Sequence, residues 1–189
     1  MSICKIASGI TFDCTNSMIP GIDATQMVVF NKSDIDYTNS VVVGTQLQSL
    51  VTLGSPAAVG YVYEGVNNSI TADYASVEDG FNPNKYNHNV GFRIFSDSAF
   101  ITDIEQFIVA ADGFVIVLFT KENLVKVAGF DVGLKANLAR NYYEEEGAAV
   151  VTYATREVEY ERKPFLTYVG SASPQAGFEA LKAEILALT

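Results

Sequence analysis

Histidine and tryptophan are nearly missing from this chain: it has no tryptophan and one histidine, His88. A single imidazole excludes most Ser-His and Cys-His constellations in which histidine is the base, and no cysteine or second histidine lies near His88 to complete a zinc site. The sequence also lacks a glycine-rich phosphate loop after a strand and the G-x-S-x-G, H-E-x-x-H and C-x-x-C motifs. We therefore expect a protein that is not an enzyme and has no cofactor or metal, with His88 in a loop or at a strand edge.

Cysteine and long apolar runs are scarce as well. Cys4 and Cys14 could form a disulfide, but nothing else in the sequence is typical of a secreted disulfide scaffold, so free thiols are favoured and their redox state stays open. The N-terminal residues lack the apolar run of a signal peptide, and no stretch reaches the roughly 18 apolar residues that cross a membrane. We expect synthesis in the cytoplasm and no membrane partner.

Basic residues are outnumbered, because 12 Lys and Arg stand against 22 Asp and Glu, for a net charge of −10. Binding to a nucleic-acid backbone gains most from Lys and Arg that displace counterions, so such binding is not expected. A wall of this charge repels DNA that passes close to it, and the same charge also keeps a concentrated protein soluble. The sequence leaves both interpretations open.

What the chain does have is a series of short β-strand patterns separated by turn signals. Its aromatic residues are Phe and Tyr, which pack well across strands. The run 114–119 is apolar throughout, as expected for a strand buried on both faces. The length fits one domain that spans residues 1–189. The predicted strands are 9–12, 27–30, 41–43, 46–53, 59–63, 89–94, 114–119, 124–130, 134–139, 148–155, 157–161 and 165–169.

Two helices interrupt this pattern. A central helix, about residues 98–112, is predicted from apolar residues at intervals of three and four, and its polar face is left for water or a neighbour: Thr102, Asp103, Glu105 and Gln106. A C-terminal helix, about residues 174–188, is predicted from Pro174 at its first position and from its own apolar stripe. At this length it must dock, on its own sheet or else on a neighbouring subunit. The predicted fold class is mainly β with α (α+β): a β-sandwich or barrel of short antiparallel strands with one flanking central helix and a C-terminal helix.

Residues 64–88 break the strand rhythm and are predicted to form an extended loop or arm. A loop of this length inside a domain is usually functional or ordered by a partner. Tyr74, Phe81 and Tyr86 are aromatic residues that a solvated loop has little reason to carry, and interfaces are enriched in them. The arm either lies on a neighbouring subunit, with these three residues as an assembly interface, or folds back on its own domain.

Acidic clusters give three further candidate sites. Glu144, Glu145 and Glu146 are followed by a glycine, which favours a hairpin tip. The three carboxylates could instead bind a metal or repel a polyanion, although alternation along a strand weakens the metal interpretation. Asp34 and Asp36 could be cation ligands, but a solvated turn is favoured because the glycine and distal glutamate of a calcium loop are missing. Charges of alternating sign over 156–163 are typical of a solvated face, or of paired contacts between subunits.

The order of these parts resembles a known group of proteins. The carrying segments are the strand NHNVGFRIF, the helix SAFITDIEQFIVA, the strand GFVIVLFTKE, the pair VAGFDVGLKA and the later KPFLTYVG, over residues 59–170. Together they resemble tail tube and tail-like structural proteins of tailed bacteriophages that infect Bacteroidetes-type bacteria. The resemblance is one of pattern and includes no catalytic or ligand motif.

The resemblance implies a β-sandwich or barrel with a helix on its flank, in hexameric rings that stack into a hollow tube. It also implies a long loop in the contacts between rings and a negative lumen through which double-stranded DNA passes without specific binding. By this resemblance, the tip of Glu144, Glu145 and Glu146 is expected at the acidic lumen or at an interface. We therefore expect a virion protein of the phage tail, whose partners are other copies of itself and other tail proteins. The alternatives are another virion component (tail terminator, head–tail connector or capsid-associated protein) and a cell-surface or carbohydrate-binding β-sandwich module, which many tyrosines and asparagines would suit.

Overall fold

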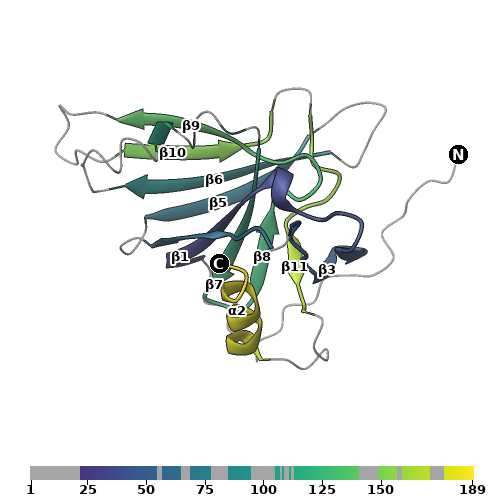
Figure 1. Ribbon diagram of the computed structural model, residues 1–189. Coiled ribbons are helices and arrows are strands. Elements are labelled where there is room, and N and C mark those ends of the chain that lie inside the picture. The colour runs from purple at the N-terminus through teal and green to yellow at the C-terminus, as the bar shows by residue number, and fades with distance from the viewer. Residues whose placement is uncertain are drawn as a thin grey trace, which may run out of the picture.

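The computed structural model (Figure 1) is mostly β, with two sheets and one C-terminal helix. It describes residues 22–54, 57–64, 69–77, 85–94, 105–106, 108, 111, 113–140, 149–156, 159–170 and 177–189. The predicted strand 9–12 lies outside these residues. Within them, no helix has the length and hydrophobicity that a membrane span requires.

The larger sheet has seven strands in the order β2-β3-β11-β8-β7-β1-β4. Its neighbours pair antiparallel, except that β11 runs parallel to β3. β2 and β4 therefore form the two edges. The strands are β1 (Ile22–Asn31), β2 (Val41–Val43), β3 (Gln46–Ser49), β4 (Tyr61–Glu64), β7 (Phe114–Thr120), β8 (Val125–Ala128) and β11 (Leu166–Tyr168).

The smaller sheet has four antiparallel strands in the order β5-β6-β10-β9. They are β5 (Ile70–Ser76), β6 (Tyr86–Ile94), β10 (Ala149–Ala154) and β9 (Lys135–Arg140). β5 and the start of β6 fall inside the segment that we predicted as a loop, and that prediction is wrong for residues 70–76 and 86–88. The cause is cross-strand pairing from Ile70 opposite Phe92 to Ser76 opposite Tyr86, which supplies the order that local periodicity did not show. Residues 65–68 and 78–84 lie outside the described residues.

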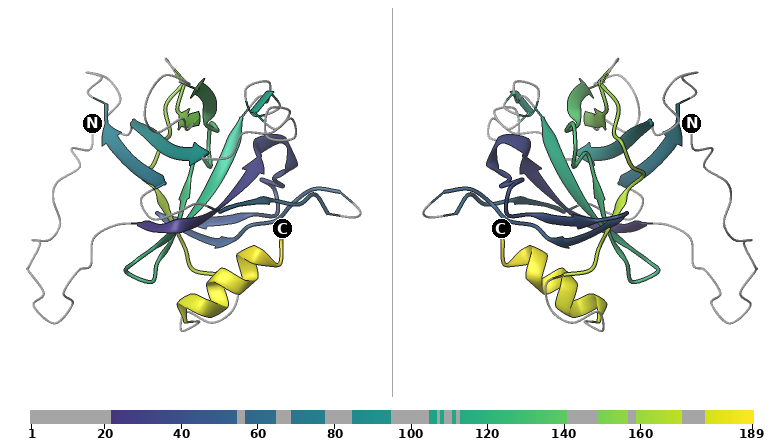
Figure 2. Two further views of the ribbon diagram at one scale, coloured as in Figure 1. Left: turned by 90° about the vertical axis from the view of Figure 1, so that its left-hand side faces the viewer. Right: turned by 90° about the vertical axis from the view of Figure 1, so that its right-hand side faces the viewer.

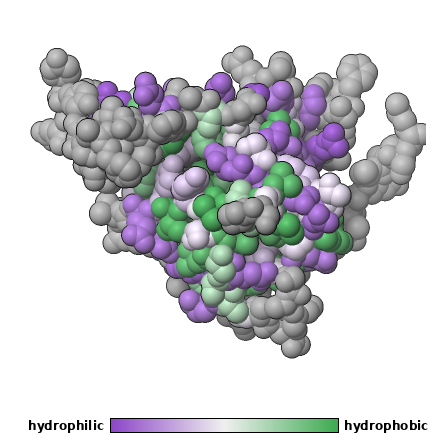
Figure 3. All heavy atoms as spheres, in the orientation of Figure 1, coloured by the Kyte–Doolittle hydropathy of each residue, from purple (hydrophilic) through white to green (hydrophobic). Residues whose placement is uncertain are grey.

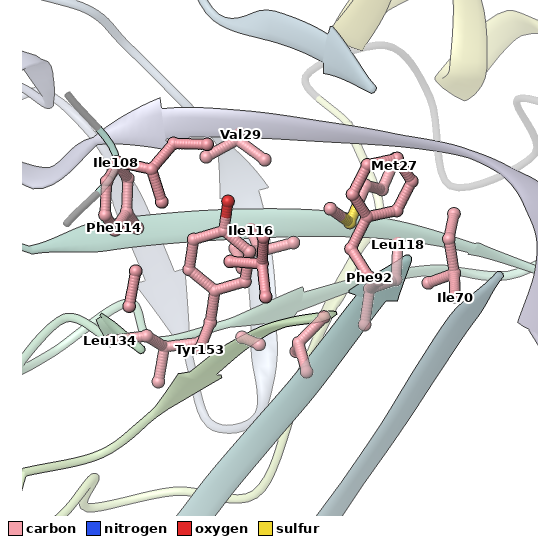
Figure 4. Close-up of a cluster of buried hydrophobic side chains, with 14 residues drawn as sticks. Met27, Val29, Ile70, Phe92, Ile108, Phe114, Ile116, Leu118, Leu134 and Tyr153 are labelled. Atoms are coloured by element: carbon pink, nitrogen blue, oxygen red, sulfur yellow. The ribbon is translucent and has the colours of Figure 1, made fainter. Parts of the chain in front are cut away.

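The core forms two layers, one on each face of the larger sheet. On its inner face, β1 and β7 pack against the smaller sheet, with Met27, Ile116 and Leu118 against Phe92 and Tyr153 (Figure 4). The alternate residues of the same two strands point to the outer face, where they join a second cluster. β7 is thus buried on both sides over Phe114–Phe119, as its uninterrupted apolar run predicted.

The outer face of the larger sheet is covered by helix α2 (Phe178–Leu186). Figure 2 shows α2, in yellow, on the side of the large sheet away from the smaller one. Ile185 is fully buried there, and Phe178, Leu181, Leu186 and Leu188 pack against the same cluster. The prediction that the C-terminal helix docks on its own sheet is confirmed; the helix begins at Phe178, and residues 171–176 lie outside the described residues.

Two other predictions are changed by the structure. Of the predicted central helix, Glu105, Gln106 and Ile108 are helical, and most of its other residues lie outside the described ones. We predicted that Glu105 faces water or a neighbour, but it is buried and forms an ion pair with Arg140 of β9 in the same chain. The predicted strand 157–161 is also wrong over its described part: only Glu161 makes an isolated bridge, opposite Tyr86.

Candidate functional site

The two edges of the large sheet expose apolar side chains. Val43 on β2 is 55% exposed and Val41 is also exposed, and at the opposite edge Tyr61 on β4 is 54% exposed. Open strand edges with apolar side chains promote pairing with another chain. These two edges are therefore the first candidates for an interaction site.

The register places Val43 and Tyr61, one exposed residue of each edge, on the same face of the sheet. Val42 pairs with Leu47, a residue of the outer cluster, so its neighbour Val43 projects from the inner face, whereas the register shifts between Val41 and Val42. Tyr61 pairs with Val29, a residue of the inner cluster, so it too projects from the inner face. The outer face is matched as well, because Val42 and Val62 both pack against the outer cluster. Each edge strand therefore has an apolar residue on the inner face of the sheet and another on the outer face.

The β4 edge continues into a wider apolar patch beside the C-terminal end of α2. Leu53 and Val59 are exposed here together with Tyr61. The amide of Ala58 donates to the carbonyl of Leu53, and the amide of Gly60 donates to that of Leu188, so this segment is tied to the end of the helix. Figure 3 shows hydrophobic residues, in green, near the middle of the face that is turned to the viewer in Figure 1. The patch enlarges the surface that a partner at this edge can bury.

The predicted interface residues Tyr74 and Tyr86 come together on the smaller sheet. Tyr74, on the edge strand β5, is 51% exposed and lies opposite His88. Its ring centroid is 5.1 Å from that of Phe165, 6.2 Å from that of Tyr86 and 6.3 Å from that of His88. Phe81 and the predicted tip Glu144, Glu145 and Glu146 lie outside the described residues. The structure therefore places Tyr74 and Tyr86 in one cluster. The proposed roles of Phe81 and of the tip Glu144, Glu145 and Glu146 stay predictions.

His88 is a buried structural residue, with 2% of its surface exposed, and not the loop or strand-edge histidine that we expected. Its Nδ1 accepts a hydrogen bond from the Gly129 amide (3.1 Å), and its Nε2 lies 2.9 Å from the Lys163 carbonyl oxygen. Because a carbonyl can only accept, the proton is on Nε2 and the ring is neutral. Burial lowers the pKa of His88 to about 4, against weaker opposing effects of the Lys163 carbonyl and Asp131. Val90 and Phe92 are buried alternate residues of β6, and the same alternation continued to His88 predicts that its side chain faces inward.

Glu161 is a second buried polar residue, in a segment that we expected to be solvated. Its carboxylate accepts hydrogen bonds from the amides of Asp131, Val132 and Gly133, at 2.9, 2.9 and 3.2 Å. Burial raises the pKa of Glu161, and the three amide bonds oppose that shift. Lys32 holds the same turn from the other side, since its ammonium donates to the Val132 carbonyl (2.6 Å). No sequence signal links Glu161 to a turn some thirty residues earlier, because its partners are main-chain amides.

These polar groups stabilise the fold and do not form a reactive centre. His88 and Glu161 are bonded to backbone, and among the described residues no group of three or more His, Cys, Asp and Glu could hold a metal ion. Asp36 accepts bonds from the Thr38 and Asn39 amides and from the Asn39 side chain, which lowers its pKa, and Asp34 accepts one from Asn31. Asp34 and Asp36 thus make the turn that we favoured.

Comparisons with known proteins add no relative. No protein-family model matches the chain, and neither a curated protein nor a solved structure matches it significantly.

Proposed function

We propose that this protein is a self-assembling structural subunit of a virion, the tail tube protein of a tailed bacteriophage, in which hexameric rings stack into a conduit for DNA. In this proposal the two described sheets form the β-sandwich of a tail tube subunit. The observation that carries the self-assembly is the pair of matched apolar edges, β2 and β4, on one sheet.

The two edges differ from one another, and that difference favours rings over closed dimers. When β2 of one copy lies beside β4 of the next, Val43 meets Tyr61 on the inner face, and Val42 meets Val62 on the outer face. A contact between two different patches is heterologous, so it repeats from copy to copy and generates a ring, or a filament if the rotation does not close. The same pairing removes both exposed edges.

The charge of the chain supports the conduit. With a net charge of −10, a ring of several copies repels the phosphates of passing DNA, which then has no reason to bind the wall. Titration with duplex DNA at low salt is expected to give no binding, and tight, salt-sensitive binding would contradict a repulsive wall.

The self-assembly is tested by placing a charge on one edge. Val43→Lys puts an ammonium group on the exposed β2 side of the proposed seam, so it should convert rings or tubes into monomers, as seen by electron microscopy and light scattering. Val150→Lys is the matched control, because Val150 is 39% exposed but lies on β10, inside the smaller sheet. This control should assemble like the wild type.

Each outcome is informative. A wild-type protein that stays a monodisperse monomer at high concentration would refute the proposal, and so would tubes that form equally well from Val43→Lys. Single rings that never stack would favour a tail terminator or head–tail connector, and closed shells would favour a capsid-associated protein.

A further inference from the structure

A cleft of about 370 Å³ opens where the inner face of the large sheet extends beyond the edge strand β5. This volume lies in the range of about 300–1,000 Å³ that is usual for small-ligand sites. Both sheets contribute to it: Tyr74 from β5, Phe165 before β11, Leu118 and Thr120 from β7, Glu122 from the turn after β7, and Lys126 from β8.

The aromatic wall of the cleft is held in place. Tyr74 is half exposed, yet its ring is tilted by 59° against Phe165, with centroids 5.1 Å apart, and it also contacts Tyr86 and His88. Phe165 in turn makes an edge contact with the buried His88 at 4.7 Å. A ring fixed in this way loses little conformational freedom when a ligand covers it, so it is suited to stacking against a flat apolar surface.

The polar wall offers hydrogen-bond donors and acceptors from charged side chains. The Lys126 ammonium donates one hydrogen bond to the Thr167 hydroxyl (2.7 Å), which leaves two N–H groups for a ligand, and Glu122 supplies a carboxylate close enough to influence the pKa of Lys126. Asp73 also lines the cleft, and its carboxylate accepts a hydrogen bond from the Asn89 side chain (3.0 Å). Asp73 and Asn89 are paired across β5 and β6, next to the pair Tyr74 and His88, so their side chains leave the sheet on the opposite face. Among the described residues, the Lys126 ammonium and the Glu122 carboxylate are thus left for a ligand, and Asp73 adds a second carboxylate to the lining.

This combination selects a class of ligand. The carboxylates of Glu122 and Asp73 would repel an anion and the Lys126 ammonium would repel a cation, whereas a neutral molecule with many hydroxyl groups can donate hydrogen bonds to Glu122 and accept them from Lys126. The C–H face of a sugar ring is the flat apolar surface that an aromatic ring binds. We infer that the cleft between β5 and the β7–β8 turn is a binding site for a neutral saccharide, with Tyr74 as its stacking platform and Lys126 and Glu122 as its hydrogen-bonding groups.

Ligand-observed saturation-transfer NMR tests this inference. The probes are maltotriose, cellotriose, mannotriose and triacetylchitotriose, with citrate and spermidine as an anion and a cation for comparison. At least one trisaccharide should receive saturation at its ring C–H protons, and citrate and spermidine should not displace it. Tyr74→Ala should weaken the binding roughly fivefold, as expected for the loss of an aromatic contact.

Further variants keep the result interpretable. Lys126→Met, similar in length and volume, should also weaken binding and provides a second readout if Tyr74→Ala does not fold. Tyr37→Ala is the control, because Tyr37 is a partly exposed tyrosine that lies outside this cleft. Val43→Lys should bind saccharide like the wild type, so a failure to assemble and a failure to bind sugar are distinguishable. Binding of no trisaccharide, binding that Tyr74→Ala leaves unchanged, or displacement by spermidine or citrate would each overturn the inference.

Discussion

The buried, neutral His88 makes the stability of this protein depend on pH in a defined direction. In the unfolded chain the imidazole takes up a proton near its ordinary pKa of 6.5, whereas in the folded protein it does so at about 4. Between these values the unfolded state binds more protons, so stability falls as the pH falls from about 6.5 to about 4 and is fully present above that window.

The size of the effect follows from the two pKa values. Their separation corresponds to at most roughly 3 kcal/mol, since each tenfold change in proton affinity is worth about 1.4 kcal/mol. Between about pH 7.5 and about pH 5, His88 is expected to remove about 2 kcal/mol. Glu161 acts in the opposite sense, because its raised pKa makes the folded state take up a proton first as the pH falls. A comparison with a variant that lacks only His88 separates the two contributions.

The assay is urea unfolding of the wild type and His88→Gln at both pH values, followed by tyrosine fluorescence, which no tryptophan obscures. The wild type should lose about 2 kcal/mol more than the variant on acidification. Because His88 is the only histidine, its Hε1 proton gives one unambiguous NMR titration, with an expected midpoint near 4. A midpoint between about 6 and 7, the range of a solvated imidazole, would refute the burial and its hydrogen bonds.

Three further predictions concern the other buried groups and one glycine. Glu161→Gln replaces an acceptor of three amide bonds with a group that has one oxygen, so unfolding experiments should show a loss of about 2 kcal/mol; unchanged stability would mean that the carboxylate does not hold the turn. Arg140→Met leaves the Glu105 carboxylate buried without this partner and should cost about 3 kcal/mol, most of which the double variant with Glu105→Leu should recover. Gly129→Ala should destabilise far more than Gly44→Ala: both have positive φ, but a Cβ on Gly129 would lie 2.6 Å from Leu134 and that on Gly44 meets nothing within 4 Å. Equal melting temperatures for the two alanine variants would contradict the packing around Gly129.

The parts of the fold that could be predicted from the sequence are those whose signal is local. β7 is an apolar run, and the apolar stripe of α2 is encoded within a few residues, whereas the described helix begins at Phe178 and its predicted start at Pro174 lies outside the described residues. β5 could not be found in this way, because it is an edge strand with five of its seven residues exposed, and it is ordered by pairing with β6. Edge strands with little burial carry little periodicity.

The candidate site was predictable in composition and not in geometry. Tyr74 and Tyr86 were singled out as aromatic residues in a polar segment, and the structure brings their rings within 6.2 Å of each other. The matched edges β2 and β4 were not foreseen, since the strand order that separates them depends on pairing between residues over a hundred positions apart, such as Leu47 with Tyr168. The same holds for Glu161, whose partners are backbone amides that have no sequence signature.

The parallel pairing of β3 with β11 bears on when an assembly edge can exist during synthesis. Within the sheet, β2 and β3 are connected to the remaining strands through β11, which follows them by more than a hundred residues in the chain. A nascent chain that ends before Leu166 can form β1, β4, β7 and β8, yet β2 and β3, which pair with each other, have no strand that joins them to the rest of this sheet. In the proposed assembly, neighbouring chains on one polysome would therefore present at most one of the two complementary edges, which would delay association until β11 has paired with β3.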